Sequence, residues 1–224
     1  MSPVQQKYEF IMDAVGEFLA VEGFTRSERC FHKLLPSAAV RWTLCSQKSR
    51  YSTSDKIKFT FEVAAEWKRR PASSEDWEAC STWYTGVGSR IGYLMPEKED
   101  TWWSIDEVTS ADSLRDQINA VLSSCVVPFL REFQTEQSIV DYLRARENDT
   151  MSRNYPHAIT MLEFDLLDKK EKSEIEKRIK RIRLLGRVQF VARAVTEAKI
   201  QRVLNAYGYS DPLPPIAPWW KLWV

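Results

Sequence analysis

The sequence predicts an α+β fold, in which an antiparallel β-sheet of four to five strands is packed by amphipathic helices and followed by a helical C-terminal extension. Apolar and polar residues alternate in residues 39–46 and 56–63, which is typical of strands with one face in water. Apolar residues recur at helical spacing in residues 4–19 and again after Ser110. We therefore expect the first helix and the helix after Ser110 to cover one face of the sheet.

The N-terminal segment predicts the first helix. Ser2 suits an N-cap, Pro3 suits the first helical position, and Gly23 suits the position after the last turn. The apolar residues between them form one stripe: Val4, Tyr8, Ile11, Met12, Val15, Phe18 and Leu19.

Strands are predicted next. Residues 24–35 and 39–46 read as two strands joined by a turn at Pro36 and Ser37. Residues 56–63 give the stronger strand, with apolar residues on one side and polar residues on the other. The two sets are Ile57, Phe59, Phe61, Val63 and Lys56, Lys58, Thr60, Glu62.

A glycine-rich stretch follows at residues 86–96. Gly86, Gly88 and Gly92 predict a tight bend, because glycine turns without steric cost and allows close approach of another surface. The bend would lead into a strand that ends at Pro96 and carries Ile91, Tyr93 and Met95.

The rest of the chain predicts helices. The helix after Ser110 meets Pro128, which kinks or ends it, and Thr135 suits the cap of a shorter helix. A later helix begins with a capping box at Ser173 and ends at Gly186. Its stripe is Ile175, Ile179, Ile182 and Leu185, and the inner face of a last helix is Val191, Ala194, Val195, Ala198 and Val203.

The chain becomes polar and charged around residues 144–154, which indicates a boundary. We therefore place an α+β domain at residues 1–146, the helical extension at 147–207 and a tail rich in proline and tryptophan at 208–224.

Composition excludes some classes of protein. A formal net charge of +1 with 28% charged residues gives no overall attraction to nucleic acid or anionic membrane. The four cysteines lack the C-x-x-C spacing of zinc and redox-dithiol sites, so we expect buried free thiols, with one disulfide as the alternative. The N-terminus has no apolar signal region, and no apolar run reaches the about 18 residues that span a bilayer. We expect a cytoplasmic protein that does not bind membranes.

Six short motifs occur in an order that resembles a known family. They are Gly23-Phe24, Gln47-Lys48-Ser49, Phe59 with Phe61, Arg90-Ile91-Gly92, Trp102-Trp103 and Pro128-Phe129. Over roughly residues 8 to 145 the chain resembles a bacterial family known as domain of unknown function 4304. The chain departs from that pattern at residues 63–66, where the family continues toward a glycine. The resemblance implies a sheet with helices, and it implies no activity or catalytic residues.

Candidate site residues are polar or aromatic. The polar ones lie in segments with a strand pattern, near the tryptophans Trp42, Trp102 and Trp103, and are Gln47, Ser49, Arg90 and, as a further candidate, Arg41. The guanidinium fork of Arg90 could hold a carboxylate or phosphate beside a tryptophan wall, as in a small-ligand or phosphoester enzyme. The alternative is an internal role, in which Arg90 pairs with Glu97, Glu99 or Asp100 or stacks on a tryptophan.

Catalytic machinery is not evident in the sequence. His32 and His157 have no partner at motif spacing, and His32 reads as a structural or surface residue. We assign no catalytic residue, no metal ligand and no cofactor.

Two further surfaces are candidates for binding. The basic run at residues 169–187 could follow phosphates, although Asp168, Glu171, Glu174 and Glu176 interrupt it as on a solvated helix. The tail carries Trp219, Trp220 and Trp223, which either pack onto the domain or anchor another subunit.

We therefore expect a non-enzymatic, cytoplasmic protein-interaction module. Its partner would be another protein, in the manner of a toxin-neutralising immunity protein or a member of a defence or secretion system. A nucleic-acid-binding protein that uses residues 169–187 and an enzyme centred on Arg90 are the alternatives.

Overall fold

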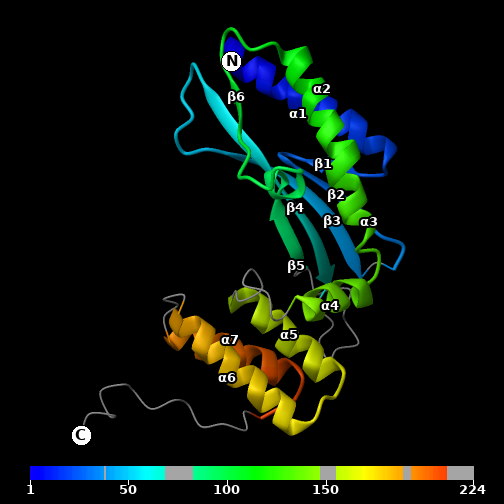
Figure 1. The fold of residues 1–224 in the computed structure, drawn as a ribbon, viewed down its shortest axis with the longest axis vertical. Helices are drawn as coiled ribbons and strands as arrows, with labels where there is room; N and C mark the ends of the chain where they lie inside the picture. Colours follow the sequence, from blue (N-terminus) through cyan, green and yellow to red (C-terminus); the bar gives the residue numbers. More distant parts are fainter. Residues whose placement is uncertain (38, 69–82, 147–154, 189–192, 211–224) are drawn as a thin grey trace, which may run out of the picture. The chain divides into compact units, whose positions relative to one another are not determined.

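A computed structural model describes residues 1–37, 39–68, 83–146, 155–188 and 193–210 (Figure 1). The described residues form two compact units, of which the first ends at Ile139 and the second begins at Val140. Each unit is described by itself. The predicted start of the helical extension, residues 147–154, lies outside the described residues.

The first helix is confirmed. Helix α1 spans Pro3–Val21, and the hydroxyl of Ser2 accepts a hydrogen bond from the backbone N–H of Gln5 at 3.2 Å. Gly23 ends the helix with a φ of 84°, a conformation that glycine adopts without strain. The predicted stripe faces inward, with Phe18 at its margin, since the buried residues are Val4, Tyr8, Ile11, Met12, Ala14, Val15 and Leu19.

The sheet is antiparallel and has six strands, in the order β1-β2-β3-β4-β5 with β6 also paired to β4. The strands are β1 Thr25–Ser27, β2 Cys30–Leu34, β3 Val40–Lys48, β4 Ile57–Lys68, β5 Trp83–Arg90 and β6 Trp103–Ile105. The prediction of one strand over residues 24–35 is wrong. Glu28 has a φ of 52° and, with Arg29, turns the chain, so this segment forms the hairpin of β1 and β2.

The predicted alternation in β4 is confirmed and separates two faces of the sheet. Ile57, Phe59, Phe61 and Val63 are buried, and Lys58 and Glu62 are exposed. Thr60 is an exception, because it is buried and its hydroxyl donates to the carbonyl of Thr101 at 2.9 Å. The pairing of β4 with β5 shifts register between Ala65 and Glu66, which lies in the segment that departs from the family pattern.

Helices α1 and α2 (Ala111–Val121) lie together on one side of the sheet (Figure 1). The indole of Trp103 connects the sheet to α2, since it donates to Gln117 at 3.1 Å. Its ring also packs against Phe59 and Phe61, and its ring centroid lies 6.0 Å from the centroid of each. This side therefore forms the apolar core of the first unit.

The prediction for the glycine-rich stretch is wrong. Gly86 and Gly88 lie inside β5, and Ile91–Leu94 is a turn of 3₁₀ helix, not a strand. These glycines allow close packing: a Cβ on Gly86 would lie 2.6 Å from Ile139, and one on Gly92 would lie 2.1 Å from the carbonyl oxygen of Glu99. Strand pairing runs on to Arg90, so the chain turns only after that residue.

The helix after Ser110 bends as predicted. A π-helical turn, Leu122–Val126, joins α2 to α3 (Val127–Arg131), and the N–H of Val127 bonds to the carbonyl of Leu122. Pro128 lacks an N–H and its ring needs space beside the preceding turn, which the wider turn provides. Helix α4 (Glu136–Ala145) follows, and the Thr135 hydroxyl accepts from the N–H of Ser138 at 3.1 Å, as its predicted cap requires.

The second unit contains α5 (Tyr155–Leu167), α6 (Lys172–Val188) and α7 (Arg193–Ala206). The stripe predicted for α6 is confirmed, since its members are buried in one core with α5 and α7. Gly186 does not end the helix. It lets α7 approach, because a Cβ there would lie 2.6 Å from the hydroxyl of Thr196.

The inner face predicted for the last helix is wrong in most of its members. Ala194, Val195 and Ala198 are exposed, and Val191 lies outside the described residues. The buried residues of α7 are Thr196, Ile200, Val203 and Leu204. None of the helices in the described ranges is both long and apolar enough to cross a membrane.

Gly92→Ala should destabilise the first unit by about 2 kcal/mol or more, because the new methyl group would overlap the backbone of Glu99 and Thr101. Urea unfolding would measure the change. Gly16→Ala is the control, since its Cβ would lie 3.3 Å from Phe31 and alanine favours helix. Equal effects of the two substitutions would contradict the close packing at Gly92.

Candidate functional site

The face of the sheet opposite α1 carries the polar residues of β2, β3, β4 and β5. We call it the open face. Cross-strand register places its residues in rows, one of which is Cys30, Cys45, Glu62 and Arg90. The next row along the strands is His32, Thr43, Ala64 and Gly88.

Cys30 and Cys45 form a disulfide across β2 and β3. The expectation of free thiols is wrong for this pair, and the alternative of one disulfide is confirmed. The two residues are direct register partners, with Cα atoms 4.1 Å apart. The neighbouring N–H of Ser46 bonds to the carbonyl of Arg29, so the cysteines occupy a position without ladder hydrogen bonds, where side chains approach most closely. Cys125 is free, and Cys80 lies outside the described residues.

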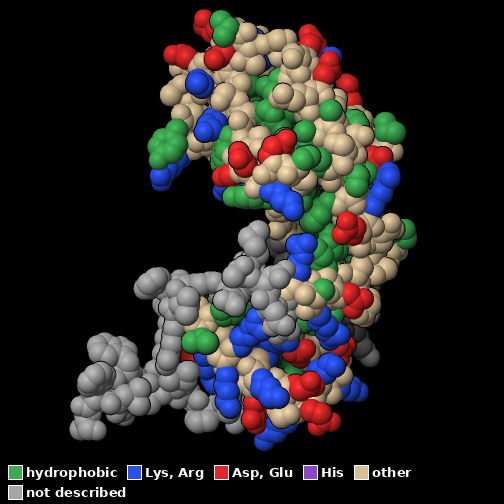
Figure 2. Space-filling model, in the orientation of Figure 1, with side chains coloured by type: hydrophobic (Ala, Val, Ile, Leu, Met, Phe, Trp, Pro, Cys, Tyr) green, Lys and Arg blue, Asp and Glu red, His purple; other side chains and the backbone are tan. Residues whose placement is uncertain are grey.

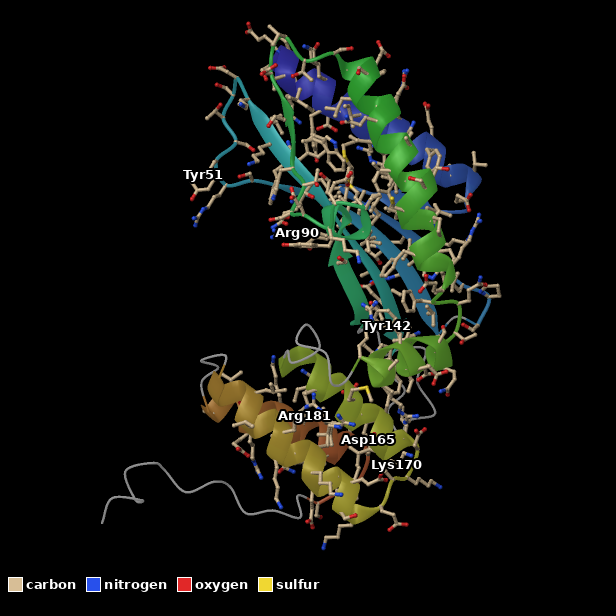
Figure 3. The ribbon with its side chains drawn as sticks, in the orientation of Figure 1. Tyr51, Arg90, Tyr142, Asp165, Lys170 and Arg181 are labelled. Carbon is tan, nitrogen blue, oxygen red and sulfur yellow. A yellow bond between two sulfur atoms is a disulfide. The ribbon has the colours of Figure 1, made fainter. Side chains whose placement is uncertain are left out.

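Arg90 is held by neighbours on this face. Its Nη1 lies 2.7 Å from Oδ2 of Asp100, and its Nε lies 4.0 Å from Oε1 of Glu62. The guanidinium carbon lies 5.3 Å from the ring centroid of Trp102. The structure thus shows the internal role that was the alternative for Arg90. Its side chain is still 34% exposed, on the side of the sheet away from α1 and α2 (Figure 3).

The two tryptophans of the Trp-Trp pair have different environments. Trp102 is partly exposed, and the ammonium of Lys58 lies 5.8 Å from its ring centroid. Trp103 is 7% exposed and belongs to the core. Only Trp102 therefore contributes to the open face.

The other predicted site residues do not belong to the cluster around Arg90. Gln47 is partly buried opposite Thr60, and its Oε1 has no hydrogen-bond partner in the part of the chain that the structure describes. Ser49 lies in the turn after β3, where its hydroxyl accepts from the N–H of Tyr51 at 3.2 Å. Trp219, Trp220 and Trp223 lie outside the described residues.

A pocket of about 300 Å³ lies where the turn between β1 and β2 meets the end of β3. Both cysteines of the disulfide line it, together with Ser27, Glu28, Arg29, Ser46, Gln47, Lys48 and Glu62. The ammonium of Lys48 is engaged elsewhere, since it bonds to Gln5 at 3.1 Å and lies 3.9 Å from the ring centroid of Tyr8.

The open face also carries a chain of hydrogen bonds that the sequence did not predict. Nε of Arg41 donates to Oε2 of Glu66 at 2.8 Å, and the hydroxyl of Thr43 donates to the same oxygen at 2.7 Å. Nδ1 of His32 lies 3.2 Å from that hydroxyl. The hydroxyl has one proton and gives it to Glu66, so His32 donates from Nδ1, and in the neutral ring Nε2 then keeps a lone pair. These four residues lie on three strands, so only the register brings them together.

The first unit matches a known family. The family described as domain of unknown function (DUF4304) matches residues 15–132, which include the whole sheet. The chain belongs to the DUF4304 family. No curated protein and no solved structure matches the chain.

In this DUF4304 protein, His32 stays neutral more readily than a free histidine. Burial lowers the pKa of its imidazole, and the charge of Arg41 lowers it further, while Glu66 acts in the opposite direction. A neutral imidazole with Nδ1 protonated presents Nε2 as a hydrogen-bond or proton acceptor on the open face.

The basic run of the DUF4304 protein is partly used for internal pairing. Nε of Arg178 lies 2.7 Å from Oδ2 of Asp165, and Arg183, whose side chain is 3% exposed, binds Glu197 at 2.7 Å. Lys177 and Lys180 are exposed. On the visible surface of the second unit, basic and acidic side chains are intermixed (Figure 2).

The lowered pKa of His32 predicts a pH dependence of stability. The unfolded chain binds the proton first as pH falls below about 6.5, so folding stability decreases from there down to the lower pKa of the folded state. His32→Gln should remove this part of the loss between pH 7 and pH 5, as measured by urea unfolding. An NMR titration that places the pKa of His32 at or above 6.5 would contradict it.

The disulfide should contribute to stability, because it closes a loop with a sequence separation of 15. Cys30→Ser with Cys45→Ser should lower the free energy of unfolding by about 3 kcal/mol. Cys125→Ser is the control, since Cys125 is not cross-linked. A loss no larger than that of the control would show that the cross-link does not constrain the chain.

Proposed function

We propose that this DUF4304 protein is a non-enzymatic protein-interaction module whose open face binds another protein. One observation carries the proposal: Arg90, Asp100 and Trp102 form a partly exposed cluster in which contacts within the face fix the arginine before any partner arrives. Arginine and tryptophan are common binding hot spots, and side chains that are already ordered lose less entropy on binding.

The charges near this cluster favour a protein partner. Lys58 and Glu62 are exposed beside Arg90 and Asp100, so both signs of charge occur within a short distance. Such a pattern suits a partner with complementary charges of both signs, whereas a polyanion would meet repulsion from Glu62 and Asp100. An external phosphate or carboxylate would also compete with Asp100 for Arg90, which makes an enzyme centred on this arginine less favourable.

Within this proposal, the partner is a toxin that the module neutralises, or a component of a bacterial defence or secretion system, and the complex forms in the cytoplasm. The mixed charge of the open face is compatible with it, because immunity to one toxin requires discrimination between similar partners.

The test is to co-express the full chain with the proteins encoded by its neighbouring genes and to measure the affinity of any complex. Arg90→Glu should weaken binding about tenfold or more. Arg115→Glu is the matched control, because Arg115 is 32% exposed, is paired with Asp112 and lies on α2. It should change the affinity less than twofold.

Two outcomes would contradict the proposal. One is a chain that remains a solitary monomer when all its neighbours are expressed. The other is a complex that Arg90→Glu leaves intact but that Lys177→Glu with Lys180→Glu disrupts, since this would assign binding to α6. Thermal unfolding of each variant would show that the fold is retained.

A further inference from the structure

The disulfide of the first unit lies where a thiol can reach it. Cys30 and Cys45 are both partly exposed, and both line the pocket of about 300 Å³. An accessible disulfide can be attacked by a thiolate at sulfur. This pocket is large enough for a small molecule to lie against the sulfur atoms.

The pocket also contains a cation without a partner. Arg29 is exposed, and its side chain makes no ion pair among the described residues. Lys48 is engaged with Gln5 and Tyr8, and Glu62 lies toward Arg90. Arg29 is therefore the lining residue that can attract a carboxylate on a ligand.

A proton acceptor lies on the same face. His32 follows Cys30 by two residues on β2, so the two side chains point the same way about 7 Å apart at their Cα atoms. Its Nδ1 is committed to Thr43, and Nε2 keeps a lone pair. A neutral imidazole two residues from Cys30 on the same face of the strand can take the proton of an incoming thiol and return it to the sulfur that leaves.

We propose that this pocket is a thiol–disulfide exchange site, in which a small thiol that carries a carboxylate binds near Arg29 and reacts with the Cys30–Cys45 disulfide. This activity is separate from the proposed binding of a protein by Arg90 and Trp102, and neither depends on the other.

The reaction consists of two thiol–disulfide exchange steps. The thiol RSH gives its proton to Nε2 of His32, its sulfur attacks one cysteine, and the S–S bond breaks. The products are a mixed disulfide with R and one free thiol, which receives the proton from His32. A second RSH attacks the mixed disulfide in the same manner, which leaves Cys30 and Cys45 as thiols and releases RSSR. The small thiol is oxidised and the protein is reduced.

The experiment uses the full chain with Cys80→Ser and Cys125→Ser, which leaves Cys30 and Cys45 as its cysteines. The oxidised protein is mixed with mercaptoacetate, which is anionic, or with 2-mercaptoethanol, which is neutral, at equal thiolate concentrations. Intact-mass spectrometry then follows the mixed disulfide and the dithiol. We expect mercaptoacetate to react about fivefold faster, as one favourable charge contact near the surface predicts.

Variants separate the roles of the residues. Arg29→Gln should bring the ratio of the two rates close to one, whereas Arg115→Gln, on α2, should leave it unchanged. His32→Gln should slow both thiols several-fold without altering the ratio. An unchanged rate in His32→Gln would remove the proton-acceptor role.

Three results would overturn the proposal. The cysteines could be alkylated as free thiols in protein purified without reductant, which would mean that no disulfide forms. The disulfide could react only in denaturant, which would mean that the pocket does not admit a thiol. The two thiols could react at equal rates in the parent and in Arg29→Gln, which would mean that the pocket does not select a carboxylate.

Discussion

The two-residue periodicity of β4 is the constraint on which the first unit depends. Alternate residues from Ile57 to Trp67 are buried, so the strand turns a continuous apolar row toward α1 and leaves Lys58, Glu62 and Glu66 on the other side. β4 also pairs with β3, β5 and β6, so one register positions all three. A shift by one residue would exchange the two faces and bring charges into the core. The open face and its charged clusters are therefore a consequence of how the core is packed.

The open face carries two kinds of polar side chain. Some already have a partner within the face, and others can still bind one. Arg90, Asp100 and Glu66 have partners within the face, whereas Nε2 of His32 and the guanidinium of Arg29 have none among the described residues. The first set is suited to recognition, because its geometry exists before binding. The second set is suited to a ligand or a proton. Cross-strand register positions His32, Glu66 and Arg90, whereas Arg29 and Asp100 come from turns beside the strands.

Sequence patterns predicted the elements with strong periodicity. The stripe of α1, the alternation of β4, the cap at Thr135 and the interruption at Pro128 depend on local chemistry, and the structure contains them all. The errors have a common cause. Gly86 and Gly92 resemble turn residues in sequence, but Ile139 and the backbone of Glu99 make them packing residues. The Cys30–Cys45 bond and the chain from Arg41 to His32 depend on which strands are neighbours, and no local pattern carries that information.

The tandem of Trp102 and Trp103 joins the interior of the first unit to its surface. The second indole is fixed by Gln117 of α2 and by the rings of β4, and the first lies beside Arg90 and Lys58. Because adjacent residues of an extended chain point in opposite directions, a small displacement of α2 would be transmitted through one peptide unit to the aromatic surface outside. Substitutions deep in this helix can thus alter the aromatic surface without any change in the exposed residues themselves.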